Sequence, residues 1–154
     1  MSGLKTNVKI ETVEQFLEEK YGNTVTGIQS LKGGEGSQAF SYRHKGKEYV
    51  VRFNKTSWGF EKDKYAFEHF SSSKITSPRV IEVGKLDDTY HFAISEKAQG
   101  ETLYNFTSSG ERVEKEYEEM LPSLIETLDE IHKIDIKKQG KYGDWNEKGM
   151  AKFD

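Results

Sequence analysis

The segment from Leu31 to Phe53 constrains the fold more than any other part of the chain; it reads LKGGEGSQAFSYRHKGKEYVVRF. Its first glycines sit at a bend, and on either side of the bend apolar and polar residues alternate as they do in half-buried strands. The Lys-Gly-Lys triplet after His44 predicts a tight turn between two strands. Together with the short run GIQSL before the bend, the segment predicts a three-stranded antiparallel meander from Ile28 to Asn54.

Helical periodicity precedes and follows this meander. In TVEQFLEEKYG, Thr12 is placed to cap a helix with Gln15 three residues on, and Gly22 is placed to end it. The apolar face of this helix holds Val13, Phe16, Leu17 and Tyr21. A second helix is predicted over GFEKDKYAFEHFSS. One stripe of that helix carries Asp63, Ala66, Phe67 and Phe70.

Two more strands and a long helix complete the predicted order of elements. A strand is predicted from Pro78, then a turn at the two acids of KLDDTY, then a returning strand over TYHFAISEKA. From Glu111 to Ile134 the apolar residues recur at helical period, and Pro122 either kinks this helix or lies in the first turn of another. Five antiparallel strands with one helix inserted after the third define an α+β fold.

The composition of the chain argues against several classes of binding partner. The chain of 154 residues carries a net charge of −3, which argues against a nucleic-acid partner, and it has no cysteine for disulfides or thiolate metal sites. No apolar run approaches the length of a membrane span, and no secretory signal is recognisable, so a cytoplasmic location is expected. None of the four histidines has a ligand-like neighbour four residues on, and no metal site is predicted.

The glycine-rich bend fits the G-x-G-x-x-G/A pattern through Gly34, Gly36 and Ala39. A dinucleotide-binding motif needs a strand before it and a helix after it, whereas this bend lies between two predicted strands. Two interpretations remain open. The bend is either an ordinary hairpin that uses glycine for positive φ, or a loop whose N–H groups cover phosphates, as in a kinase.

Arg52 favours the phosphate loop. It lies inside the otherwise apolar strand YVVRF, where a guanidinium needs an anionic partner. Protein kinases carry a lysine in this strand, paired with an acid on the following helix. Asp63 is the preferred acid because it shares a face with Phe67, and Glu61 is the competitor. The alternative is an edge-strand arginine that reaches water, with Asp63 as a surface acid.

The chain resembles the aminoglycoside phosphotransferases over about residues 12 to 103. The stretches that carry the resemblance are TVEQFLEEKYG, GGEGSQAFSYRHKGKEYVVRFN, GFEKDKYAFEHFSSSKITSPRVIEVG and ISEKAQGETL. The helix through Leu128 and the segment GKYGDW agree more loosely. The resemblance implies a protein-kinase-like N-lobe at residues 1–98, followed by a hinge and the first helices of a truncated C-lobe at residues 99–154.

The resemblance also implies roles for single residues. Gly34, Gly36 and Ser37 would cover the phosphates of ATP or GTP, Arg52 would replace the usual lysine, and Asp63 would hold Arg52. Ser95, Glu96 and Ala98 would bind the adenine through their main chain. The implied activity, in the presence of Mg²⁺, is phosphorylation of a hydroxyl on a small cationic antibiotic.

The chain departs from the family in its catalytic residues. The family needs a His-x-Asp-x-x-x-x-Asn loop and a later metal-binding Asp, yet no histidine here is followed two residues on by Asp, and no Asp-Phe-Gly occurs. No catalytic or metal-binding residue is therefore predicted, and a fragment inactive alone is the first hypothesis. The second is a non-catalytic module that self-associates or binds a partner through exposed helix faces. The third is an α+β protein with a coincidental glycine turn.

Overall fold

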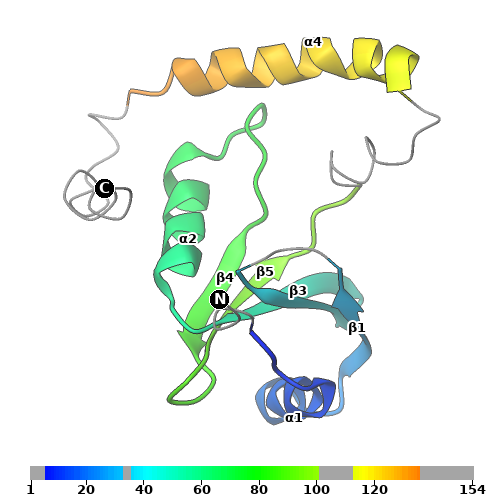
Figure 1. The fold of residues 1–154 in the computed structure, drawn as a ribbon, viewed down its shortest axis with the longest axis vertical. Helices are drawn as coiled ribbons and strands as arrows, with labels where there is room; N and C mark the ends of the chain where they lie inside the picture. The colour runs from blue at the N-terminus through cyan, green and yellow to red at the C-terminus, as the bar shows by residue number, and fades with distance from the viewer. Residues whose placement is uncertain (1–5, 33–35, 101–112, 136–154) are drawn as a thin grey trace, which may run out of the picture. The chain divides into compact units, whose positions relative to one another are not determined.

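The computed structural model describes residues 6–32, 36–100 and 113–135, and Figure 1 traces the elements in chain order. Contacts divide the chain into two compact units, Met1–Phe67 with Pro78–Ala98, and Glu68–Ser77 with Gln99–Asp154. The elements are α1 (Ile10–Tyr21), β1 (Val25–Leu31), β2 (Gln38–His44), β3 (Lys47–Asn54), α2 (Trp58–Phe70), β4 (Val80–Lys85), β5 (His91–Glu96) and α4 (Val113–His132).

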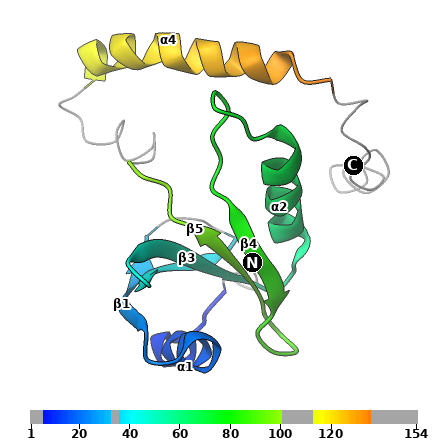
Figure 2. The same ribbon diagram turned by 180° about the vertical axis from the view of Figure 1, so that it is seen from behind.

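The five strands form one antiparallel sheet in the order β1-β2-β3-β5-β4. Viewed from behind, β5 lies between β3 and β4 (Figure 2). The hairpin between β2 and β3 turns through Lys45 and Gly46, whose φ values of 50° and 77° suit a two-residue turn of left-handed residues. The predicted meander and the helix inserted after the third strand are both confirmed.

The hydrophobic core lies between α1 and one face of the sheet. Val13 and Leu17 of α1 are fully buried against Phe40, Val51 and other apolar strand residues. Phe16 completes the contact, with its ring centroid 4.7 Å from that of Phe92. The helical face predicted for this segment is therefore the face that builds the core.

The start of α1 differs from its prediction. The helix begins at Ile10, and Lys9 occupies the capping position without a side-chain hydrogen bond. The Thr12 N–H already donates to the Lys9 carbonyl at 3.1 Å, so Thr12 lies inside the first turn and cannot cap it. Gln15 donates to Glu19 instead, which makes the predicted capping box wrong. Gly22 does end the helix, with φ of 65°.

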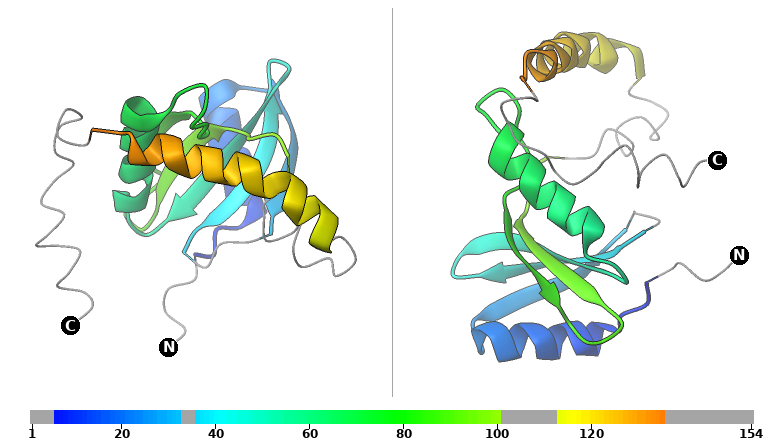
Figure 3. Two further views of the ribbon diagram at one scale, coloured as in Figure 1. Left: turned by 90° about the horizontal axis from the view of Figure 1, so that it is seen from above. Right: turned by 90° about the vertical axis from the view of Figure 1, so that its left-hand side faces the viewer.

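Helix α2 lies on the side of the sheet opposite α1 (Figure 3). The residues of the predicted stripe, Asp63, Ala66, Phe67 and Phe70, all lie in α2. Asp63 is exposed and the other three are half-buried. The buried residue of α2 is Phe60, which was not included in the predicted stripe but lies on the same helical face, one turn before Asp63. The N-terminal turns of α2 therefore provide its closest packing.

The second unit contains α4, a single helix with Pro122 inside it. Of the two arrangements left open for Pro122, one continuous helix is correct. Lys74 from the segment after α2 forms ion pairs with Glu126 and Glu130 at 3.4 and 3.3 Å. These two acids lie on the side of α4 opposite its apolar residues. The segment GKYGDW and the predicted start of this helix at Glu111 lie outside the described residues.

Candidate functional site

The face of the sheet that carries Arg52, hereafter the Arg52 face, is the one turned away from α1. Strand register places Ala39 and Ala93 on either side of Arg52. In the same way, Ser41 and Ser95 flank Val50, which lies two residues before Arg52 on β3. Side chains this small leave the backbone accessible to a flat group laid across the strands, in contrast to the aromatic rings of the α1 side.

Arg52 is bound to α2 by two contacts. Its Nη1 lies 2.8 Å from Oδ2 of Asp63, and its guanidinium carbon lies 5.1 Å from the ring centroid of Phe60. The Arg52 side chain is 27% exposed and that of Asp63 is 47% exposed. The pair is thus held in place on one side by protein while its other side is open to solvent, which suits a cation that receives an anionic ligand.

The competing acid, Glu61, is engaged elsewhere. Its carboxylate accepts a hydrogen bond of 2.7 Å from the hydroxyl of Ser57, and its N–H donates to the Ser57 carbonyl. Glu61 therefore stabilises the first turn of α2, where acids are favoured by the helix dipole. The partner of Arg52 is Asp63, as the helical face indicated.

The glycine-rich bend joins β1 to β2 beside the end of β3. Gly34 lies outside the described residues, whereas Gly36 and Ser37 lie directly before β2. A Cβ on Gly36 would come 3.9 Å from Nδ2 of Asn54, so the bend approaches the last residue of β3. This end of the sheet is also where Arg52 stands, two residues earlier on the same strand.

The predicted adenine-binding residues lie at the other end of the Arg52 face. Ser95 is buried within β5, where it pairs with strands on both sides. The N–H of Glu96 donates to the Arg79 carbonyl at 3.0 Å, and the N–H of Lys97 donates to the Glu48 carbonyl at 3.1 Å. Both donors are thus used by the protein, and Ala98 follows directly where the chain leaves the sheet.

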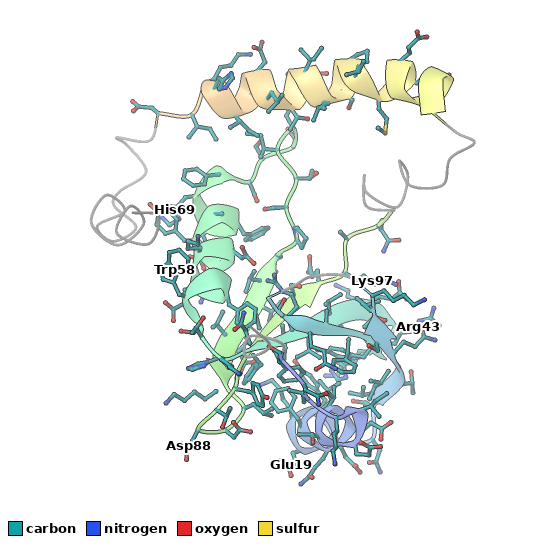
Figure 4. All side chains as sticks on the ribbon, viewed as in Figure 1. Glu19, Arg43, Trp58, His69, Asp88 and Lys97 are labelled. Carbon is teal, nitrogen blue, oxygen red and sulfur yellow. The ribbon has the colours of Figure 1, made fainter. Side chains whose placement is uncertain are left out.

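A pocket of about 330 Å³ opens at this end of the sheet. It is lined by Thr26, Gly27, Gln29, Ser41, Tyr42, Arg43, Glu48 and Lys97. Figure 4 shows Arg43 and Lys97 on the same side of the first unit. The Glu48 carboxylate lies 3.4 Å from a nitrogen of each, and these cations, Lys97 foremost, lower its pKa below the usual glutamate value. Sequence reasoning did not identify this acid, which is one ordinary charged residue in a hairpin.

Two polar residues of the Arg52 face also escaped the sequence analysis. Asn54 follows Arg52 by two residues, and His91 is its direct partner on β5. Two-residue periodicity along YVVRFN would have placed Asn54 beside Arg52. The pairing with His91 joins strands separated by α2 and β4, and no local pattern encodes it.

Within residues 6–32, 36–100 and 113–135, no group of three or more histidine or acidic side chains is arranged to hold a metal ion. None of the helices described combines the length and apolar content needed to cross a membrane.

Comparisons with known proteins give relatives in sequence and in fold. No established family profile matches the chain. Hygromycin-B 4-O-kinase of Escherichia coli is 32% identical over 149 residues, which cover 97% of this chain and 42% of that protein. The crystal structure of aminoglycoside phosphotransferase APH(4)-Ia matches with a TM-score of 0.74 and 35% identity, over 82% of this chain and 40% of that one.

A related crystal structure, of a thermostable mutant of the same phosphotransferase, is a ternary complex with AMP-PNP and hygromycin B. It matches with a TM-score of 0.71 and 34% identity, again over 82% of this chain and 40% of that one. The kinase PK-1 of Cydia pomonella granulovirus, 14% identical with a TM-score of 0.50, shares the fold alone. The chain thus spans about two fifths of the phosphotransferases that it resembles.

Proposed function

The chain resembles the aminoglycoside phosphotransferases in sequence and fold over about two fifths of their length, and from this likeness we propose that it is the nucleotide-binding part of such an enzyme. The observation that carries the proposal is the Arg52–Asp63 ion pair beside a glycine-rich bend. In this proposal residues 1–98 form the nucleotide lobe and residues 99–154 begin the second lobe. The full enzyme would phosphorylate a hydroxyl of a hygromycin B-like aminoglycoside.

In this proposal the phosphates and the base of the nucleotide bind at opposite ends of the Arg52 face. At the bend, Gly36 and Ser37 offer main-chain N–H groups to phosphate oxygens, and Arg52 supplies the positive charge. Asp63 fixes the direction of the guanidinium through its 2.8 Å contact. At the other end, the small side chains around Ser95 receive the base of ATP or GTP, with the main chain at Glu96 and Ala98 along its edge.

The 154-residue chain is proposed to bind nucleotide without transferring phosphate. Phosphoryl transfer depends on a carboxylate that orients the acceptor hydroxyl and on acids that hold Mg²⁺. The chain has no His-x-Asp sequence that could supply the first. Positioning and charge neutralisation provide nearly all of this catalysis, so binding through Arg52 alone leaves the reaction unassisted.

The proposal is tested with the purified 154-residue chain, ATP and hygromycin B. We expect ATP to raise the melting temperature, Arg52→Ala to abolish that rise, and Lys9→Ala, an exposed cation outside the sheet, to leave it unchanged. We also expect no phosphorylated antibiotic by mass spectrometry. Measured phosphoryl transfer would contradict the proposed inactivity, and an unchanged melting temperature with ATP would contradict nucleotide binding.

A second candidate function is favoured by the apolar side of α4. Five large side chains on that side are exposed by 43% to 62%. They are Leu121, Leu124, Ile125, Leu128 and Ile131. Their spacing puts them on one stripe of the helix, opposite the acids that bind Lys74. A stripe of this kind marks a contact surface, and in this alternative the chain is a non-catalytic module that self-associates through α4.

Light scattering distinguishes the two functions. The alternative predicts a dimer that Leu124→Lys and Leu128→Lys together convert to a monomer. Glu119→Lys, an exposed position on the opposite side of the same helix, should leave the dimer intact. A monomeric chain that ATP stabilises would contradict the alternative and support the nucleotide-binding proposal.

A further inference from the structure

Asn54 presents an amide donor at the glycine-rich bend. Its Oδ1 accepts a hydrogen bond of 3.3 Å from the N–H of Thr56. That contact fixes the side chain so that Nδ2 faces the bend, 3.9 Å from the position of a Cβ on Gly36. Among the described residues, no acceptor engages Nδ2. The contact with Thr56 therefore orients this amide by its oxygen, and within the described residues both of its N–H groups are available.

One polar atom beside Asn54 also lacks a partner among the described residues. Its strand partner is His91 on β5. The Nδ1 atom of His91 is buried, and within the described part of the chain it has no hydrogen-bond partner. Buried polar atoms without partners are rare in folded proteins, and a bound ligand is one reason for their presence.

Charge and position identify the ligand group. Arg52 and Asn54 alternate with the buried residue Phe53, so both side chains project from the Arg52 face. The guanidinium, the amide and the bend thus converge at one end of that face. A neutral double donor beside a cation suits an anion with several acceptor oxygens, such as a phosphate chain.

We propose that Asn54 binds the phosphate chain of the nucleotide by donating its side-chain amide, as a specificity residue alongside Arg52. This inference rests on the proposed nucleotide-binding function. Arg52 attracts any anion, whereas the fixed amide of Asn54 donates a hydrogen bond only to an oxygen at one position. Asn54 therefore contributes to the affinity for ATP and tripolyphosphate and contributes nothing to the affinity for adenosine.

The test is a nuclear magnetic resonance titration of the 15N-labelled chain with ATP, tripolyphosphate and adenosine. The side-chain amide of Asn54 is assigned from the signal that disappears in Asn54→Ala. We expect this signal to move with ATP and with tripolyphosphate, and to stay in place with adenosine. The side-chain amide of Asn23, in the exposed turn after α1, is the internal control and should not move with any of the three.

Two variants add an affinity measurement. Asn54→Ala should weaken ATP binding by about 10- to 100-fold, the usual worth of one hydrogen bond to a charged group, and change adenosine binding by less than about twofold. Asn54→Asp keeps the acceptor for the Thr56 N–H but replaces the donor by a negative oxygen. It should weaken ATP binding more than the alanine variant does, and it serves as the folded comparison if Asn54→Ala loses structure.

The outcomes separate this inference from the function on which it rests. If ATP binds and Arg52→Ala weakens it, yet the Asn54 amide stays in place and both Asn54 variants bind ATP normally, the inference is wrong and the proposed function stands. If ATP and tripolyphosphate move no signal in the unaltered chain, both are wrong.

Discussion

At the scale of single residues, the site depends on how Arg52 is held. A guanidinium makes a planar fork, and one edge of that fork is occupied by Asp63 at 2.8 Å. The Phe60 ring stacks on the same group at 5.1 Å. An arginine fixed in this way presents its remaining N–H groups in one direction, which a flexible lysine ammonium does not. In the phosphotransferase proposal, the arginine that replaces the usual kinase lysine therefore makes a more fixed contact with phosphate.

Glu48 provides a prediction about ionisation. Because Lys97 and Arg43 lower its pKa, any stability that the acid contributes is present above the ordinary glutamate pKa and is lost as the pH falls through the lowered value. We expect the titration midpoint of Glu48, followed by carboxyl 13C shifts, to lie below the usual glutamate range. Lys97→Met should raise the midpoint, since Lys97 is the main cause, while Lys9→Met should not. A midpoint unaffected by Lys97→Met would contradict the assignment.

At the scale of elements, local sequence patterns predicted single helices and strands, whereas the pairing of distant strands could not be predicted from them. The alternation in QAFSYRH puts Phe40 and Tyr42 on one side of the strand, and in the structure both are buried in the core. The helical cap was misplaced because α1 begins at Ile10 after Lys9, which makes no side-chain cap, so no sequence signal marks the start. The insertion of β5 between β3 and β4 also left no local signature. Asp63 was found by its helical face. Phe60 lies on the same face one turn earlier, so extending the helical period toward the start of α2 would have found it too.

The contact between β4 and β5 gives a prediction about packing. A Cβ on Gly84 would lie 2.8 Å from two atoms of the Phe92 ring, and that ring is buried against Phe16. Gly84→Ala should therefore lower the free energy of unfolding by about 1–3 kcal/mol, as overpacking does. The measurement is urea denaturation followed by tryptophan fluorescence.

Gly59 is the matched control for this substitution. It lies in the first turn of α2 with no atom within 4 Å of an added Cβ. Gly59→Ala should leave the free energy of unfolding unchanged or raise it by up to about 1 kcal/mol. Equal urea midpoints for Gly84→Ala and the unaltered protein would contradict the packing of Phe92 described here.

At the scale of the whole molecule, the two units contain different candidate functional surfaces. The first contains the sheet, the core and the Arg52 face. The second contains α4 with its exposed apolar stripe. In the phosphotransferase proposal, the first unit binds nucleotide and the second begins the lobe that receives the antibiotic. The stripe then marks the surface that further residues of such a lobe cover.

The central claim is that the Arg52 face binds nucleotide. Isothermal titration of the 154-residue chain with ATP tests it most directly, with Arg52→Ala, Arg52→Lys and Lys9→Ala titrated beside it. We predict saturable binding that is lost in Arg52→Ala, weakened in Arg52→Lys, since a point charge cannot replace the fork, and unchanged in Lys9→Ala. The absence of binding to the unaltered chain, or equal binding to Arg52→Ala, would contradict the claim.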